Sequence, residues 1–152
     1  MPRDQHTYGG ISIVDNATAT VISGIGIANK VQFLFFDTND PSQNTTPDHT
    51  SDDITIDDTS DYLVTVSITI DSIAGAAATY GLFCYINNGA TAVPNLHAHR
   101  DMPAGGGVEG SISLSGIATL TAADTIELWV VNETNTQNVI LSDVTMSVVS
   151  VG

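Results

Sequence analysis

Hydrophobic and polar residues alternate along most of this chain with the two-residue period of β-strands. The clearest run is 62–70, where every second residue is apolar and Thr or Ser lies between, with only Leu63 out of pattern. Val, Ile and Thr dominate, and these β-branched side chains suit a pleated surface. No window repeats apolar residues with helical spacing. The pattern predicts an all-β protein.

Turn-forming residues divide this pattern into short segments. Asn88-Gly89 predicts a tight hairpin turn, and the segment 90–102 that follows is expected to cross over. Residues 37–53, rich in Asp, Asn and Thr, are expected to form a long exposed acidic loop. The spacing predicts a single domain, 1–152, built as a two-sheet sandwich or jelly roll. The expected strands are 8–14, 17–23, 31–36, 54–56, 62–70, 78–87, 110–117, 125–131 and 139–151.

Two of the expected strands carry apolar residues on both faces. Phe83 and Tyr85 lie opposite the core face of one strand, and Trp129 and Val131 lie opposite that of the other. Strands that are apolar on both sides are usually covered on both sides. We therefore expect these four residues to be covered, either by a loop of the same chain or by another subunit. Cys84, on the core face, is expected to be an inert small hydrophobe.

The charge balance limits the possible partners. The 152-residue chain has 17 acidic residues and three Lys or Arg, a formal net charge of −14. Such a chain repels nucleic acid and anionic lipid, so we expect neither as a partner, whereas a basic surface, a cation or a neutral glycan remains acceptable. No apolar run suits a membrane helix, no signal peptide is expected, and a single cysteine excludes an internal disulfide.

Two groups of residues could carry site chemistry. His97 and His99 would face the same side of a strand and could bind a metal with Asp101, but a polar loop in which Arg100 pairs with a carboxylate, or a partner contact, are alternatives. The acidic segment could bind calcium, although its spacing is not that of an EF-hand loop, and a solvated loop is the alternative. No cofactor is therefore assigned. The calcium candidates are Asp37, Asp40, Asp48, Asp52, Asp53, Asp57 and Asp58.

The chain contains no recognisable catalytic motif. No Ser lies in a Gly-x-Ser-x-Gly sequence, and neither glycine-rich segment has the spacing of a phosphate-binding loop. We therefore expect a protein that is not an enzyme.

The order of four motifs resembles the C1q and tumour-necrosis-factor (TNF) jelly-roll superfamily. The motifs are 61–67 (DYLVTVS), 80–89 (YGLFCYINNG), 110–116 (GSISLSG) and 123–130 (ADTIELWV). Together with the His-Arg element at Arg100, the arrangement is similar to that of short bacteriophage structural proteins. This resemblance covers residues 54–152 and implies a TNF/C1q-like two-sheet jelly-roll sandwich that assembles as a homotrimer.

The resemblance also implies a function. We expect a phage capsid decoration (cement) protein that binds the major capsid protein on the outer surface of the virion and stabilises the shell. The alternative is a receptor- or glycan-binding tip of a tail or head fibre, with specificity in 37–53 and 90–107, although the chain shows no stalk or coiled-coil pattern. The expected partner-interface residues are Phe83, Tyr85, Trp129, Val131, His97, His99 and Arg100.

Overall fold

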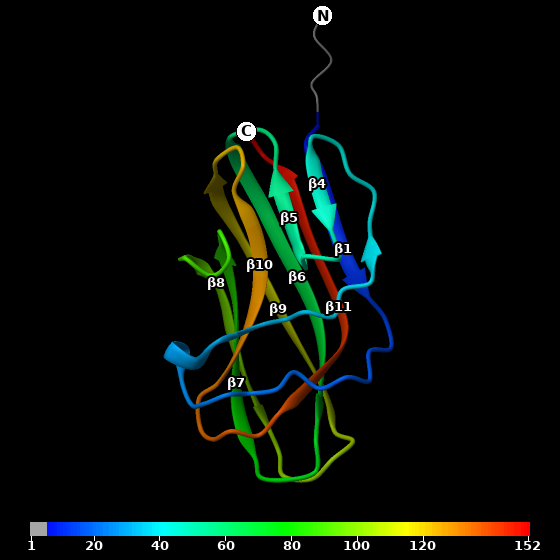
Figure 1. Cartoon of the computed structure of the whole chain (residues 1–152), viewed down its shortest axis with the longest axis vertical. Coiled ribbons are helices and arrows are strands. Elements are labelled where there is room, and N and C mark those ends of the chain that lie inside the picture. The colour runs from blue at the N-terminus through cyan, green and yellow to red at the C-terminus, as the bar shows by residue number, and fades with distance from the viewer. Residues whose placement is uncertain (1–5) are drawn as a thin grey trace, which may run out of the picture.

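The computed structural model describes residues 6–152, which form two antiparallel sheets packed face to face (Figure 1). The helical structure of this range is a single 3-10 turn at Ile27–Asn29, and the range contains no helix that is long and apolar enough to cross a membrane. The strands are β1 (Tyr8–Ile13), β2 (Val31–Gln32), β3 (Thr38–Asn39), β4 (Thr45–Asp48), β5 (Asp53–Ile56), β6 (Ser60–Ser72), β7 (Ala78–Ile86), β8 (Thr91–Met102), β9 (Glu109–Leu120), β10 (Thr125–Asn132) and β11 (Val139–Ser150).

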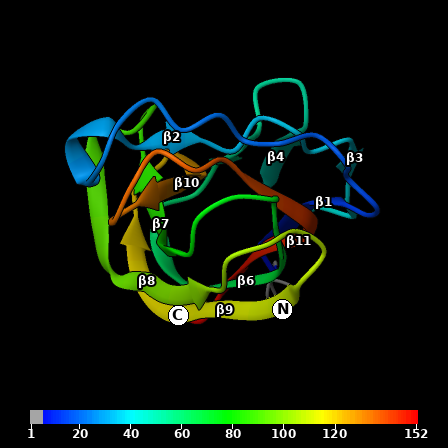
Figure 2. The ribbon, with the colours of Figure 1, turned by 90° about the horizontal axis from the view of Figure 1, so that it is seen from below.

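The two sheets have the strand order of a jelly roll. Sheet A runs β3-β1-β11-β6-β9, and sheet B runs β4-β5-β10-β7-β8, with β2 paired to β10 beside β5. Strands that are neighbours in a sheet are therefore mostly distant in sequence. Figure 2 looks along the sandwich and shows β8 and β9, the edge strands of the two sheets, side by side. This confirms the predicted two-sheet jelly roll.

The core lies between the sheets and is built by the alternation seen in the sequence. In β6, Tyr62, Val64, Val66, Ile68 and Ile70 are at most 2% exposed, while the residues between them face outward. The same core includes residues from β1 to β11, and Cys84 is fully buried within it. Leu63, the residue out of pattern in the sequence, lies on the outer face of sheet A and is 36% exposed.

The segment before β3 corrects two predicted strands. Residues 17–23 form no strand, and their one ladder-type contact is an isolated bridge between Thr20 and Val139. Of the predicted strand 31–36, only Val31 and Gln32 are paired as a strand. Figure 1 shows this segment crossing the sandwich and returning. Its apolar side chains do not alternate in a ladder: Ile22, Phe33 and Phe36 are buried in the core, whereas other apolar residues of the segment are exposed, and Phe33 lies outside β2.

The predicted loop 37–53 is also wrong. It contains β3, paired with β1, and β4, paired with β5. Both strands are short and lie at sheet edges, where Pro47 is tolerated because an edge strand has backbone groups that need no ladder partner. The predicted crossover 90–102 is the long edge strand β8, and the pairing of β7 with β8 is shifted between Phe83 and Tyr85.

Candidate functional site

The outer face of sheet A carries an exposed apolar row. Leu63 on β6 is paired with both Val149 on β11 and Ile117 on β9, and Val149 is also paired with Tyr8 on β1. Leu63 is 36%, Val149 44% and Ile117 56% exposed. We call these four residues the apolar row. It crosses four neighbouring strands and is therefore a candidate contact surface.

The residues next to the row, towards the middle of this face, are small and polar. In the next register position, Thr65 is paired with Ser147 and Ser115, and the hydroxyls of Thr65 and Ser147 lie 2.8 Å apart. Short side chains of this kind leave the sheet surface flat and open to close packing. At the far end, Asp71 lies opposite Glu109, and the two like charges disfavour an apolar partner there.

A groove next to the apolar row lies between β8 and β9. It has a volume of about 300 Å³, and its lining includes Val93, Pro94, Ala118 and Ile117. Asn95 closes one side by donating a hydrogen bond of 2.8 Å from Nδ2 to the backbone oxygen of Ile117. Ile117 therefore belongs both to the apolar row and to the groove.

The outer face of sheet B brings together most of the residues that the sequence singled out. Strand register aligns Trp129, Phe83 and His97 across β10, β7 and β8. The rings of Phe83 and His97 are nearly parallel, with centroids 5.5 Å apart and an interplanar angle of 12°, and His99 approaches Phe83 at 5.7 Å. We call Phe83, Tyr85, Trp129, His97 and His99 the aromatic–histidine surface.

The chain itself covers one end of this surface. The ammonium of Lys30 lies 4.8 Å from the ring centroid of Tyr85 and 5.2 Å from that of Trp129, which are cation–π distances. Tyr85 is 8% and Val131 1% exposed, so both are buried without a second subunit. Phe83 and Trp129 are half-buried, and His97 and His99 are exposed. The histidine side of the surface is therefore open.

A buried carboxylate that the sequence analysis did not identify supports this face. Glu127 is 1% exposed and accepts hydrogen bonds from the backbone N–H groups of Asn88 and Gly89, at 2.8 and 3.1 Å. Its oxygens also accept from the Thr125 hydroxyl at 2.6 Å and from the Trp129 indole at 3.3 Å. It thereby ties the Asn-Gly turn to the strand that carries Trp129. The sequence feature that could have indicated this role is a single acidic residue, Glu127, within an otherwise apolar strand, together with the Asn88-Gly89 turn.

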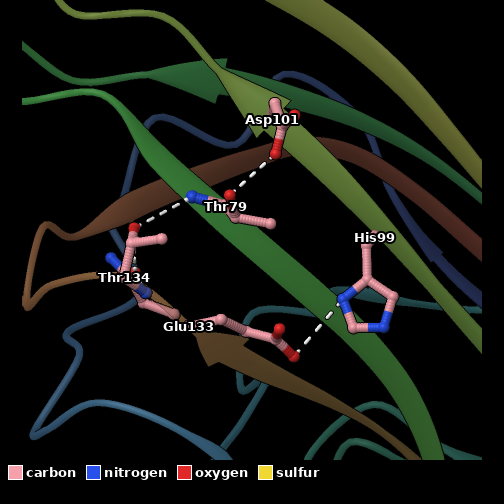
Figure 3. Close-up of polar contacts among 6 residues, drawn as sticks. Thr79, His99, Asp101, Glu133 and Thr134 are labelled. Atoms are coloured by element: carbon pink, nitrogen blue, oxygen red, sulfur yellow. Dashed lines mark hydrogen bonds and ion pairs between the residues drawn. The ribbon is translucent and has the colours of Figure 1, made fainter.

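Polar groups surround a hollow at the other end of the aromatic–histidine surface (Figure 3). The Thr79 hydroxyl donates to Asp101 Oδ1 at 2.7 Å, and the Thr79 N–H donates to the Thr134 hydroxyl at 3.1 Å. His99 Nδ1 lies 3.3 Å from Glu133 Oε1. The hollow measures about 530 Å³, and Thr79, Asp101 and Thr134 are part of its lining.

Arg100 points away from this site. Its guanidinium lies close to Gly110 of β9, and its Nη1 donates to the Ser111 backbone oxygen at 3.5 Å. It therefore helps to join the edges of the two sheets. Within residues 6–152, no three His, Cys, Asp or Glu side chains are grouped so that they could hold a metal ion, and the carboxylate beside His99 comes from Glu133 rather than Asp101.

The seven aspartates proposed for calcium do not converge on one point in residues 6–152. Several make separate bonds: Asp40 accepts from Ser12, and Asp48 accepts from Thr50. Asp52 is buried and accepts the Phe36 N–H at 2.9 Å. Burial raises the pKa of Asp52 to about 6.

Cys84 does not offer a reactive thiol. It is fully buried, and burial, with a smaller contribution from the Glu127 charge, raises its pKa to about 12. Since the thiolate is the nucleophilic form, the cysteine is unreactive at neutral pH. The prediction of an inert core residue is confirmed.

Comparison with solved structures identifies the fold. Murine APRIL at pH 5.0 superposes with a TM-score of 0.61 at 13% identity, covering 95% of this chain and 99% of that one. Eiger TNF from S. frugiperda superposes with a TM-score of 0.62 at 15% identity, covering 96% and 94% of the two chains. No family model matches the sequence, and no curated protein matches it. At these identities the likeness shows the fold alone, and that fold is the TNF-like jelly roll.

Proposed function

We propose that this protein is a non-enzymatic structural protein that acts as a homotrimer and decorates the outer surface of a bacteriophage capsid. The observation that carries the self-association is the apolar row of Tyr8, Leu63, Ile117 and Val149, which borders small polar residues on the outer face of sheet A. Burying it removes exposed apolar surface from water, and the carboxylate of Asp61, which lies beside the row on β6, accepts the Thr119 hydroxyl.

The arrangement of the surfaces favours a ring over a two-fold dimer. In a two-fold dimer the same patch meets itself, whereas a closed ring joins two different patches of neighbouring subunits. The apolar row and the β8–β9 groove are two such patches, and they adjoin at Ile117. When the groove edge of one subunit packs against the apolar row of the next, each contact covers one groove and one row. The TNF-like fold is compatible with this packing.

The proposed role on a shell rests on charge and on the resemblance of the motif order to phage structural proteins. With a formal net charge of −14 on each chain, the trimer suits a basic or neutral surface on the major capsid protein. The protein acts there by burying interface between neighbouring capsid subunits, which resists the pressure of packed DNA. Its reactive side chains serve structure, since Cys84 is buried in the core and Glu127 binds a turn.

The self-association is tested by native mass spectrometry at micromolar concentration. We expect a mass three times that of the 15.8 kDa chain. Leu63→Asp and Ile117→Asp each place a charge in the apolar row and are expected to give monomers. Leu34→Asp is the matched control, because Leu34 is 54% exposed and lies outside the row. A wild-type protein that is monomeric overturns the trimer.

The location is tested by immunogold electron microscopy of the source virion with antibody raised against this chain. Label over the icosahedral head supports decoration. Label confined to the tail end replaces decoration with receptor binding, and the absence of label on any particle overturns the viral assignment.

A further inference from the structure

The open part of the aromatic–histidine surface lies on the side of the sandwich opposite the apolar row. The row is on the outer face of sheet A, and Phe83, His97 and His99 are on the outer face of sheet B. The proposed self-association uses the row and the β8–β9 groove, whose lining does not include Phe83, His97 or His99, so it leaves this surface free. Only its Tyr85 and Trp129 end is covered, by Lys30.

Strand register places aromatic and polar groups in successive positions along this surface. The outward residues of β7 run from Phe83 through Gly81 to Thr79. The residues paired with them on β8 are, in the same order, His97, His99 and Asp101. Glu133 adjoins the last position, because its N–H donates to the Thr79 oxygen at 2.9 Å. The aromatic rings of Phe83 and His97 are therefore followed, along the same face, by the polar groups of Thr79 and Asp101.

Gly81 allows the two parts to meet. A Cβ at this position would lie 2.6 Å from Cε2 of Phe83 and 3.2 Å from Oε1 of Glu133. The ring of Phe83 therefore extends over the glycine towards the carboxylate. Because glycine has no side chain, the Phe83 ring and the Glu133 carboxylate lie next to each other on the sheet surface. His99 lies beside them, with its ring centroid 5.7 Å from that of Phe83.

The hollow at the polar end is an open depression of about 530 Å³ that adjoins the aromatic–histidine surface. Asp101, Thr79 and Thr134 supply hydroxyl and carboxylate groups, and Ala77 and Pro103 supply apolar contact. Asp101 and Glu133 use few of their acceptor sites within the chain, as one bond to Thr79 and one contact with His99 show.

We propose that this surface binds a neutral pyranose glycan. The C–H face of a sugar ring packs against Phe83 where its ring extends over Gly81, and the hydroxyls donate to Glu133 and, one register position further along, to Asp101. An aromatic ring next to paired acceptors suits a ligand that is apolar on its ring face and rich in donors at its rim. A purely apolar ligand would displace water from the two carboxylates without offering them donors, and the net charge of −14 opposes an anionic sugar.

The test is saturation-transfer NMR with the methyl glycosides of glucose, galactose, mannose and N-acetylglucosamine. We expect transfer to the ring protons of at least one of them, with a dissociation constant of roughly 1 mM or below. A methyl sialoside is expected to show none. Absence of transfer to all four neutral glycosides overturns the proposal, and so does binding confined to the sialoside.

Three variants locate the binding. Phe83→Ala and Asp101→Asn are each expected to weaken it at least about tenfold, which is about 1.4 kcal/mol. Gly81→Ala is expected to weaken it by displacing the Phe83 ring. Ser113→Ala, exposed on the outer face of sheet A, is the control and is expected to bind as the wild type does. Circular dichroism and an unchanged oligomeric mass confirm folding, and binding that is unaffected by both Phe83→Ala and Asp101→Asn overturns the site.

This proposal is independent of the oligomeric state. The monomer expected from Leu63→Asp retains the whole surface and is expected to bind the glycoside with unchanged affinity. Loss of binding in that variant would overturn the placement of the site on a single chain. A trimer that binds no sugar would leave the proposed self-association intact.

Discussion

Glu127 shows how one buried residue organises the face that carries Trp129. Its two oxygens accept four hydrogen bonds, two of them from the backbone of the turn that follows β7. Gly89 completes this arrangement, because a Cβ there would lie 2.6 Å from the Trp129 ring. The Asn-Gly turn was predictable from the sequence, but its anchor was not, since the turn and Glu127 are distant in sequence.

The substitution Glu127→Gln is expected to destabilise the protein by about 1–3 kcal/mol. Both oxygens of Glu127 accept hydrogen bonds, whereas glutamine has one oxygen and one NH₂ group. The NH₂ group would face N–H or O–H donors, and these donors would lose their acceptor. Urea denaturation measures the free energy of unfolding. Glu133→Gln, at an exposed position, is the control and is expected to change it by less than about 0.5 kcal/mol. Equal effects of the two substitutions would contradict the anchoring role.

Asp52 is expected to make stability depend on pH. Its pKa is about 6 in the folded protein, raised mainly by burial from an ordinary value of 3.8. Below about pH 4 the carboxyl is protonated in both the folded and unfolded states, and above about pH 6 it is charged in both. The raised folded pKa thus contributes stability at low pH, and this contribution is lost as the pH rises from about 4 to 6.

The variant Asp52→Asn isolates this effect. Asparagine keeps the Oδ1 that accepts the Phe36 N–H but carries no charge to bury. We expect the variant to be more stable than the wild type by roughly 1–2 kcal/mol at pH 8 and equally stable at pH 4. Solvent screening keeps the difference at pH 8 this small, because the neighbouring Ser51 is exposed. Thermal unfolding at the two pH values measures the difference. An equal difference at both would show that the carboxyl charge is not responsible.

Among the elements, the long strands were predictable and the short ones were not. β6 and β9 alternate strictly because one face is core and the other is open, so their period is visible in the sequence. β3 and β4 have two and four residues and depend on β1 and β5 for pairing, which local sequence does not reveal. Phe33 has the apolar character of a strand residue but fills the core from a crossing segment.

The loop after β10 depends on one buried amide. Asn132 is fully buried, and its Oδ1 accepts the N–H groups of Thr134 and Asn135, both at 3.0 Å. Its Nδ2 donates to Asn135 Oδ1 at 2.7 Å and to the Gln137 backbone oxygen at 3.0 Å. The side chain therefore shapes the loop that carries Glu133 and Thr134.

The substitution Asn132→Ala is expected to cost about 2–4 kcal/mol in the free energy of unfolding. It leaves two loop N–H groups without their acceptor, so hydrogen exchange at Thr134 and Asn135 is expected to accelerate most. The half-buried Asn135→Ala removes fewer of these bonds and is expected to cost less. Faster exchange spread evenly over the sheets would contradict a local role.

At the scale of the whole molecule, the sequence predicts which residues share a face but not what covers that face. Period-two spacing was sufficient to align Phe83 with Tyr85, and Trp129 with Val131. Lys30 covers Tyr85 and Trp129, although it lies more than fifty positions away in the sequence and comes from the crossing segment. The polar hollow depends equally on contacts between distant segments, such as that of Thr79 with Thr134.

Net charge gives the last prediction, which concerns the proposed trimer. Three chains of −14 carry −42 together, and the two fixed side-chain cations of residues 6–152 act within the chain: Lys30 lies over two rings, and Arg100 joins β8 to β9. Association is then driven by the apolar row and opposed by repulsion. Because salt shortens the range of repulsion from about 30 Å at 0.01 M to about 8 Å at 0.15 M, we expect salt to tighten the trimer.

Sedimentation equilibrium at these two salt concentrations measures the effect. The trimer is expected to dissociate at a higher protein concentration in low salt, and its sedimentation in high salt is expected to fit a single species. A charge-paired interface has the opposite response, because screening weakens attraction between unlike charges. A trimer that weakens as salt rises would therefore show that the contact lies away from the apolar row, on a surface where the acidic residues meet cations.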